Sequence, residues 1–249
     1  MDKALIRRRF SKAVGSYTRQ ADVQRKIAVR LSGLVDRYVP VSSRKKVLEV
    51  GCGTGLFTRH FLLESHPEQL LLNDICSEMK SCFTDILGKN IRFEAGDAES
   101  LAFPGGQDLI VSCSAIQWFE YPERFLNGCR SLLNKDGFLA ISTFGPENVR
   151  EITSLTDSAL PYRSLQELRS GLEKEYQVVY AKEELVDMSF SSPMEVLRHL
   201  KETGVTGIRD FRWTKRTLSD FCRRYEERYT KPDGNVSLTY HPIYIICRK

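Results

Sequence analysis

The segment EVGCGTG, residues 49–55, is the most informative stretch of this sequence. It overlaps the end of an apolar run at residues 46–50, which predicts a buried strand, and it precedes a helical pattern that continues to about residue 63. Three glycines at alternate positions allow the backbone to turn sharply and to approach a ligand closely. Because a helix begins directly afterwards, its free N–H groups also face the loop. The segment therefore predicts a ligand-binding loop at the carboxyl end of a buried strand.

The spacing of the glycines separates two classes of ligand. A dinucleotide-binding loop has the pattern G-x-G-x-x-G, which would put its last glycine at position 56, where this chain has Leu56. This difference excludes an NAD-dependent dehydrogenase. The loop resembles instead the E-x-G-x-G-x-G loop of class I S-adenosylmethionine (SAM) methyltransferases, in which it faces the methionine part of the cofactor.

Apolar runs and helical patterns alternate after this loop. The patterns predict strands at residues 70–74, 91–94, 108–112 and 137–144, and helices at 77–87 and from 121 to about 133. Five strands that alternate with helices are typical of an α/β protein with a Rossmann-like, doubly wound and mostly parallel sheet. Before the loop, the spacing of apolar residues predicts an amphipathic helix over residues 18–38.

Beyond residue 145 the pattern becomes mainly helical. Helices are predicted at 146–159, 164–176 and 192–204, with one strand at 178–186 and an antiparallel last strand at 237–247. The helix at 192–204 has clear end signals: Ser192 as N-cap with Glu195 completing a capping box, Pro193 at the first helical position, and Gly204 at the end.

These elements predict one methyltransferase domain, residues 1–249. We expect a basic N-terminal helical segment (1–40), a SAM-binding core (41–145), a helical lid insertion (146–210), and a C-terminal helix and strand (211–249).

Composition and charge limit the class of protein. No apolar run approaches the roughly 20 residues of a membrane span, and seven cysteines without a C-x-x-C pair favour neither a zinc site nor a disulfide framework. We therefore expect a cytoplasmic protein without a bound metal. Residues 1–46 hold 13 Lys and Arg against 3 Asp and Glu. Such a segment is either a docking surface for an acidic partner or a solvated helix face.

Two carboxylates follow later strands and complete the expected cofactor site. Asp74 ends the second strand, 19 residues after Gly55, where a carboxylate can accept hydrogen bonds from ribose hydroxyls. Asp97 follows the third strand, and the resemblance implies that it contacts the adenine amino group. The predicted cofactor-binding residues are Glu49, Gly51, Cys52, Gly53, Gly55, Asp74, Ile75, Asp97, Ala98 and Ser112.

Several further motifs resemble the malonyl-acyl-carrier-protein O-methyltransferases of biotin synthesis. They are Arg9–Ala13 with Tyr17, Ala21 and Gln24; Gln117–Phe119; Ser142–Pro146; Ser192–Pro193 with Leu197–Lys201 and Thr203–Val205; and Leu238–His241. The resemblance spans nearly the whole chain. Cys113 and Thr206 depart from it, because Asn is expected at both positions.

The resemblance implies methylation of the free carboxylate of a malonyl thioester, carried by acyl carrier protein or by coenzyme A. Because that carboxylate is ionised at neutral pH, its attack on the methyl group needs alignment more than a base. Tyr17 is implied as the residue that closes over cofactor and substrate, or else as a packing residue. The predicted substrate-binding residues are Gln117, Trp118, Phe144, Arg150, Arg198 and His199. Each cationic side chain among them has the alternative of a solvated helix face.

Other functions remain open. A SAM methyltransferase for another small organic acid or a quinone-type acceptor would share every cofactor residue. A non-catalytic SAM-binding protein would not need the full loop with Asp74 and Asp97. RNA methylation is disfavoured, because residues 112–115 read SCSA rather than N-P-P-Y. We expect a monomer that binds neither nucleic acid nor membrane.

Overall fold

The computed structural model describes residues 2–156, 160–203 and 213–249, and of residues 12–20 only the backbone. Its elements in chain order are α1 (Lys3–Gln20), α2 (Asp22–Tyr38), η1 (Val41–Ser43), β1 (Lys46–Val50), α3 (Leu56–Glu64), β2 (Gln69–Asp74), η2 (Ser77–Phe83), β3 (Ile91–Ala95), β4 (Gln107–Cys113), η3 (Ile116–Trp118), α4 (Pro122–Leu132), β5 (Leu133–Phe144), α5 (Arg150–Thr156), α6 (Leu165–Leu172), β6 (Gln177–Glu183), β7 (Val186–Phe190), α7 (Pro193–Glu202), α8 (Lys215–Tyr229), β8 (Val236–Tyr240) and β9 (Pro242–Arg248).

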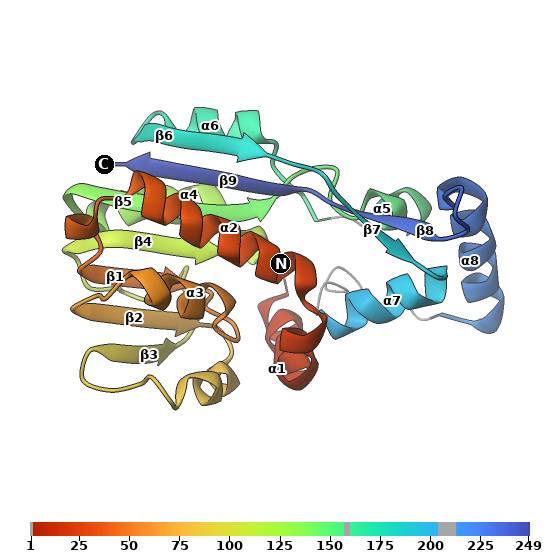
Figure 1. The fold of residues 1–249 in the computed structure, drawn as a ribbon, viewed down its shortest axis with the longest axis horizontal. Helices are drawn as coiled ribbons and strands as arrows, with labels where there is room; N and C mark the ends of the chain where they lie inside the picture. Colours follow the sequence, from red (N-terminus) through yellow and green to blue (C-terminus); the bar gives the residue numbers. More distant parts are fainter. Residues whose placement is uncertain (1, 157–159, 204–212) are drawn as a thin grey trace.

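A seven-stranded sheet forms the centre of the molecule, in the order β3-β2-β1-β4-β5-β9-β6 (Figure 1). Strands β1 to β5 are parallel, and β9 lies antiparallel between β5 and β6. The predicted doubly wound, mostly parallel sheet with an antiparallel last strand is therefore confirmed. Because the strand order reverses beside β1, the loops after β1 and β4 open a crevice at the carboxyl edge of the sheet.

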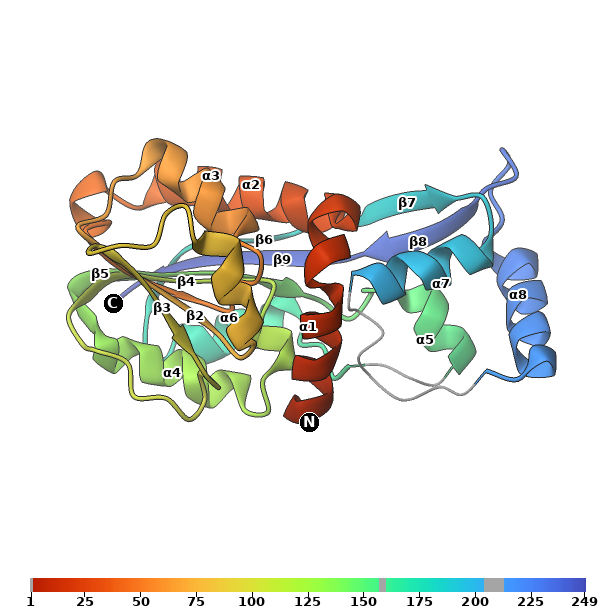
Figure 2. The ribbon, with the colours of Figure 1, turned by 90° about the horizontal axis from the view of Figure 1, so that it is seen from below.

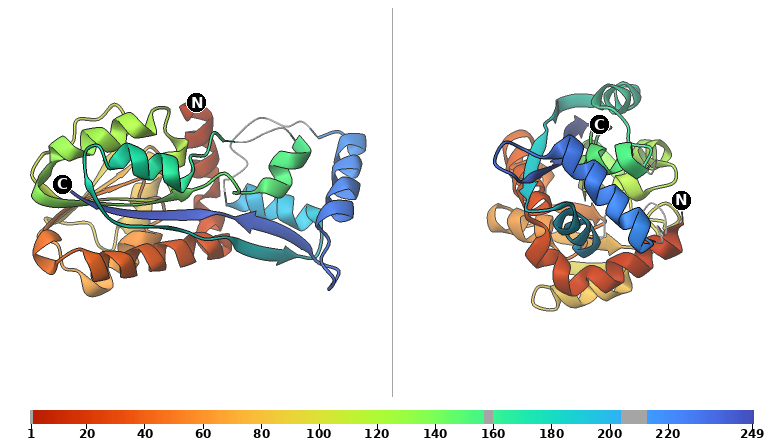
Figure 3. Two further views of the ribbon diagram at one scale, coloured as in Figure 1. Left: turned by 90° about the horizontal axis from the view of Figure 1, so that it is seen from above. Right: turned by 90° about the vertical axis from the view of Figure 1, so that its right-hand side faces the viewer.

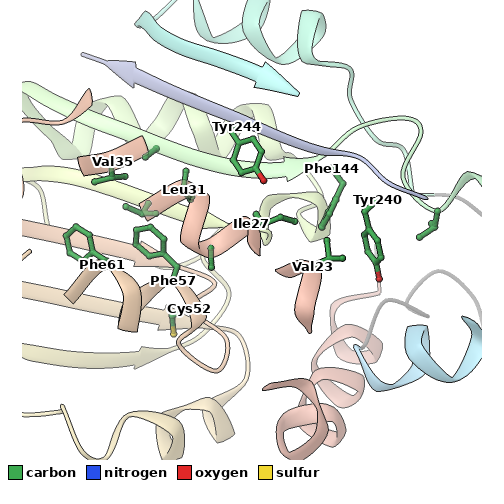
Figure 4. Packing of buried hydrophobic residues seen from close by; sticks show 14 of the residues in the cluster. Val23, Ile27, Leu31, Val35, Cys52, Phe57, Phe61, Phe144, Tyr240 and Tyr244 are labelled. Carbon is green, nitrogen blue, oxygen red and sulfur yellow. The ribbon is translucent and has the colours of Figure 1, made fainter. Parts of the chain in front are cut away.

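Helices cover both faces of the sheet. Figure 2 shows α2 and α3 over one face and α4 and α6 over the other. Helix α2 buries Ile27, Leu31 and Val35 completely against the sheet, and Phe57 and Phe61 of α3 stack beside them (Figure 4). The apolar spacing that predicted this helix is thus the face that holds it on the core.

Two strands of the sheet continue beyond it and carry the lid. Strand β6 leads into β7, and β8 leads into β9, so that β7 and β8 pair as a separate antiparallel ribbon (Figures 1 and 3). Helices α5, α7 and α8 gather around this ribbon, away from the central sheet. The strand predicted at 178–186 corresponds to β6, but β7 follows it and was not predicted. The prediction of a single strand at 237–247 was wrong, since β8 and β9 are separated by a break at His241. At this break, the backbone N–H of His241 bonds to Asn148 instead of to a strand.

Three predicted helices also differ in extent. Residues 77–83 form a 3-10 helix rather than an α-helix, with Met79 and Phe83 buried under the glycine loop. Helix α5 begins only at Arg150, because the backbone N–H groups of Gly145 and Val149 bond to the carbonyls of His241 and Thr239. The last turn of α6 likewise stops at Leu172.

The start of α7 agrees with its signals. Pro193 is the first helical residue, and the Ser192 hydroxyl accepts a hydrogen bond from the backbone N–H of Glu195. A capping box has two hydrogen bonds, and the described residues show one of them, from the Glu195 N–H to the Ser192 hydroxyl. Gly204, the predicted end, lies outside them.

Helix α1 stands across the gap between the core and the lid (Figure 2). It packs against η2 on one side and α7 on the other. Arg7 donates a hydrogen bond to the Ser77 hydroxyl at 3.3 Å, which ties the helix to the loop after β2. In the part of the chain that the structure describes, no helix has both the length and the apolarity to cross a membrane.

Candidate active site

A deep pocket lies at the carboxyl ends of β1 to β4, where the glycine loop, η3 and α1 meet. The space within it is about 1000 Å³, including the part open to solvent. Its walls are Lys3, Ile6, Phe10, Gln24, Glu49–Thr54, Leu56, Phe57, Asn73–Ile75, Met79, Gly96–Ala98, Cys113–Ala115, Trp118 and Phe119. The size and the largely apolar lining are those of a small-molecule site.

The glycine loop forms the floor of this pocket. Gly53 has φ +53°, and a Cβ built on it would meet nothing within 4 Å, so this residue brings bare backbone to open space in the pocket. Gly55 has a different role. A Cβ there would lie 2.7 Å from the ring of Phe83, so the glycine lets η2 pack against the start of α3.

Two buried carboxylates face the pocket from neighbouring strands. Asp74 accepts hydrogen bonds from the backbone N–H groups of Gly53 (2.9 Å) and Cys76 (2.8 Å), which fixes both carboxylate oxygens. Glu49 is 1% exposed and accepts from the Thr58 hydroxyl at 2.7 Å. Burial raises the pKa of Asp74, and it raises that of Glu49 to about 8. Burying such acidic groups is costly unless a cation or donors balance them.

The third predicted carboxylate already has a partner. Lys3 of α1 contacts Asp97 and Glu99, with its Nζ 2.5 Å from a carboxylate oxygen of each. The other oxygen of Asp97 accepts from the backbone N–H of Glu99 at 3.0 Å. Lys3 therefore closes α1 over the end of the pocket where Asp97 lies.

A second, smaller chamber adjoins this pocket on the lid side. Its walls are Phe10, Gln24, Ser114, Gln117, Trp118, Phe144, Asn148, Tyr162, Thr203 and Tyr240. It shares Phe10, Gln24, Ser114 and Trp118 with the first pocket. The two pockets are therefore adjacent. The predicted cofactor-binding loop lines the first pocket, and three predicted substrate-binding residues, Gln117, Trp118 and Phe144, line the second. After these predictions we call the first the cofactor pocket and the second the acceptor chamber.

Residues 48–141 match the family model described as "Methyltransferase domain". The chain is 47% identical over 260 residues to a malonyl-[acyl-carrier protein] O-methyltransferase of Bacteroides thetaiotaomicron, covering 100% of this chain and 99% of that protein. A protein of the same name from Haemophilus influenzae is 36% identical, with 100% and 95% covered. The chain belongs to the malonyl-[acyl-carrier protein] O-methyltransferase family.

One relative is longer. A malonyl-[acyl-carrier protein] O-methyltransferase of Bacteroides fragilis is 48% identical over 99% of this chain, which spans 50% of that protein. Solved structures share the fold at low identity. A Bacillus halodurans putative methyltransferase has TM-score 0.65 at 16% identity, covering 88% of this chain and 98% of its own. A Burkholderia thailandensis 1,6-didemethyltoxoflavin-N1-methyltransferase, solved with S-adenosylhomocysteine, has TM-score 0.55 at 18% identity, covering 99% and 88%.

The cofactor pocket of this methyltransferase suits SAM, the cofactor of the fold. SAM is a cation at its sulfur and its amino group, and the pocket presents the buried carboxylates of Glu49 and Asp74. The hydroxyl of Thr54 lines the pocket, is buried and has no hydrogen-bond partner in the structure, so a ligand can satisfy it. The open space over Gly53 leaves room for that ligand.

The predicted cofactor residues mostly surround this pocket. All of them line it except Gly55, which packs on Phe83, and Ser112, which lies buried behind the wall. Their contacts with SAM stay a prediction. Lys3, Thr54 and Ser114 were not predicted. Ser114 has φ +54°, a strained value for a residue other than glycine, and it directly follows the observed end of β4, two residues after the predicted end.

The predicted substrate residues separate into two groups. Gln117, Trp118 and Phe144 line the acceptor chamber. Arg150 and Arg198 lie outside both pockets, and their side chains are 51% and 61% exposed.

Both arginines form ion pairs with nearby glutamates in the structure. Arg150 pairs with Glu147 and Glu151, and Arg198 with Glu195. Both arginines therefore lie on solvated helix faces, which is the alternative that the sequence left open for them.

His199 stands behind the chamber wall rather than in it. It is buried, and its Nε2 is 2.8 Å from the hydroxyl of Tyr240, which does line the chamber. Burial lowers the pKa of His199, so the ring is neutral at neutral pH. The side chain of Tyr17, on α1, and Thr206 both lie outside the described residues.

Proposed function

We propose that this chain methylates the free carboxylate of a malonyl thioester carried by acyl carrier protein, and so prepares the first unit for pimeloyl-chain synthesis in the biotin pathway. The observation that carries the proposal is the pair of adjacent chambers in a chain that matches malonyl-[acyl-carrier protein] O-methyltransferases over its whole length. Esterification removes the negative charge, which allows the acyl end to enter an apolar elongation site.

The reaction needs alignment of the carboxylate with the methyl donor and exclusion of water, rather than a base. SAM, when bound, supplies a methyl group on a positively charged sulfur, so that attack by a carboxylate oxygen forms the ester and leaves the electron pair of the broken bond on sulfur. Asp74 and the Gly53 backbone orient the donor side of the site. Trp118, Phe144 and Phe10 enclose the acceptor side and exclude water, which strengthens the attraction between carboxylate and methyl donor. No proton has to be removed in this step.

The basic N-terminal segment provides a surface for the carrier. Arg7 and Arg8 are exposed on α1, whose residues Lys3, Ile6 and Phe10 form part of the pocket wall. A strongly acidic carrier protein would be attracted to this helix and would arrive beside the mouth of the pocket. We propose that the carrier is preferred to coenzyme A for this reason, and that the chain acts as a monomer in the cytoplasm.

The test is transfer of radiolabelled methyl from SAM to malonyl-acyl carrier protein, with malonyl-coenzyme A and with succinyl- and acetyl-carriers as controls. We expect a base-labile labelled ester on the malonyl carrier. The acetyl carrier has no free carboxylate and should stay unlabelled. Failure to label any malonyl thioester by a chain that binds SAM would refute the proposal and direct the search to free organic acids and quinone-type acceptors.

A further inference from the structure

The acceptor chamber has apolar walls with several polar groups among them, and none of its described lining residues is a cation. Its polar walls are the amides of Gln24, Gln117 and Asn148 and the hydroxyls of Ser114, Tyr162, Thr203 and Tyr240. The arginines expected to bind the substrate carboxylate, Arg150 and Arg198, are paired with glutamates elsewhere. The described part of the chamber therefore offers a carboxylate neutral donors.

One of these donors is held in a fixed direction. The Asn148 side-chain oxygen accepts from the backbone N–H of His241 at 3.2 Å, so its Nδ2 must face the other way. That nitrogen donates to the hydroxyl oxygen of Tyr162 at 2.9 Å. Because Tyr162 accepts in this bond, its own proton is left to donate to another group. Burial raises the pKa of Tyr162 to about 12, so the proton stays on the hydroxyl at neutral pH.

Two other lining residues supply polar atoms that lack partners. The Ser114 hydroxyl and the Gln24 side-chain oxygen are buried without a hydrogen-bond partner, and both residues line both chambers. The hydroxyl of Tyr240, another lining residue, lies 2.8 Å from Nε2 of His199. Unpartnered buried polar atoms are costly in a folded protein, and a bound polar ligand removes that cost.

We propose that Tyr162, oriented by Asn148, donates a hydrogen bond to the acceptor's carboxylate, and that this carboxylate is held by neutral donors rather than by Arg150 or Arg198. The inference rests on the proposed function, in which that carboxylate is the nucleophile. One carboxylate oxygen is held by Tyr162, and the other stays free to attack the methyl group.

The chemistry favours neutral donors over a cation. The reaction joins a carboxylate to a positively charged sulfonium and yields two neutral products, so charge disappears as the transition state forms. A cation beside the carboxylate would stabilise the substrate more than the transition state and would slow the step. A neutral hydroxyl also fixes the position of the carboxylate, and it stabilises the substrate relative to the transition state less than a cation does.

The experiment measures kcat/KM for malonyl-acyl carrier protein and the Kd for SAM in wild type, Tyr162→Phe and the control Tyr121→Phe. Tyr121 is exposed and lies outside both chambers. A hydrogen bond to a charged group corresponds to a roughly ten- to hundredfold effect, so we expect this fall in kcat/KM for Tyr162→Phe. The Kd for SAM, and activity in Tyr121→Phe, should stay within about twofold.

Two arginine variants and the binding of the methyl ester product provide further tests. Arg150→Gln and Arg198→Gln should change kcat/KM by less than about threefold, since both arginine side chains are more than half exposed and lie outside both chambers. The Kd of the methyl ester product should hardly change in Tyr162→Phe, because its carboxylate charge is gone.

Each failure has its own signature. An active wild type with an unaffected Tyr162→Phe, a large loss in either arginine variant alone, or equal weakening of substrate and product binding in Tyr162→Phe would overturn the inference. A wild type that methylates no malonyl thioester would refute the proposed function, and this inference with it.

Discussion

Replacing Glu49 by Gln should stabilise the ligand-free protein and remove much of its pH dependence. Burial raises the pKa of this carboxyl from an ordinary value of 4.5 to about 8. Between these two values the folded chain keeps a proton that the unfolded chain loses, so the free energy of unfolding falls as pH rises and the loss is complete above pH 8. At about 1.4 kcal/mol for each pKa unit, the difference amounts to at most about 3 kcal/mol at pH 7 and about 5 kcal/mol above pH 8.

Glutamine keeps the shape of the side chain and the acceptor for the Thr58 hydroxyl, but it has no proton to lose. Urea unfolding from pH 5 to 9 should therefore show a slope in wild type that is absent in Glu49→Gln. Glu120→Gln, at an exposed position outside both chambers, is the matched control. Equal slopes in wild type and Glu49→Gln would refute the reasoning.

The same carboxyl links cofactor binding to pH. A cation in the pocket favours the ionised form of Glu49, so SAM should bind with release of a proton near pH 7. Calorimetry in two buffers of different ionisation enthalpy measures that release. In Glu49→Gln the release should vanish and the Kd for SAM should rise, which gives a more stable protein that binds less well.

Three other substitutions test the pocket and the lid. Gly53→Ala puts a methyl group into the cofactor pocket at φ +53°, so the Kd for SAM in calorimetry should rise at least tenfold while stability falls by only about 1–2 kcal/mol. Lys3→Ala removes the contact that closes α1 over Asp97, and stopped-flow should show SAM dissociating up to about fivefold faster. Glu151→Gln weakens two buried bonds to Thr239, so urea unfolding should show a loss of about 1.5–3 kcal/mol with SAM affinity unchanged. An unchanged Kd in Gly53→Ala, an unchanged dissociation rate in Lys3→Ala or an unchanged stability in Glu151→Gln would contradict the role given to that residue.

The central sheet was predictable because each strand carries its own signal. Buried parallel strands are short apolar runs, and the run at 46–50 matched β1 to the residue. The helices and strands of the lid were less predictable, because their boundaries depend on contacts between distant segments. At His241 the strand pattern breaks where Gly145 and Asn148 lie beside it in the fold. Pro242, which has no N–H for a strand ladder, is the local signal of this break that the prediction missed.

The candidate site divides in the same way. The cofactor side follows from one loop motif and two carboxylates at strand ends, positions that a parallel sheet brings together. On the acceptor side the sequence suggested arginines, because charge is visible in a sequence while pairing is not. Arg198 has Glu195 within one helical turn, which is the signal that could have warned against it. Asn148 and Tyr162 are 14 residues apart and show no pattern before the chain folds.

The position of β9 has a consequence for how the chain is made. Residues 242–248 form all the ladder bonds that attach β6 to the sheet, and they occupy a place between two strands that the ribosome produces earlier. Until residues 242–248 emerge, the apolar edge of β5 can pair with other nascent chains. The ribbon that carries the lid is also not yet attached to the central sheet. We therefore expect stalled translation products lacking these residues to depend on chaperones, although the entire glycine loop has already been synthesised.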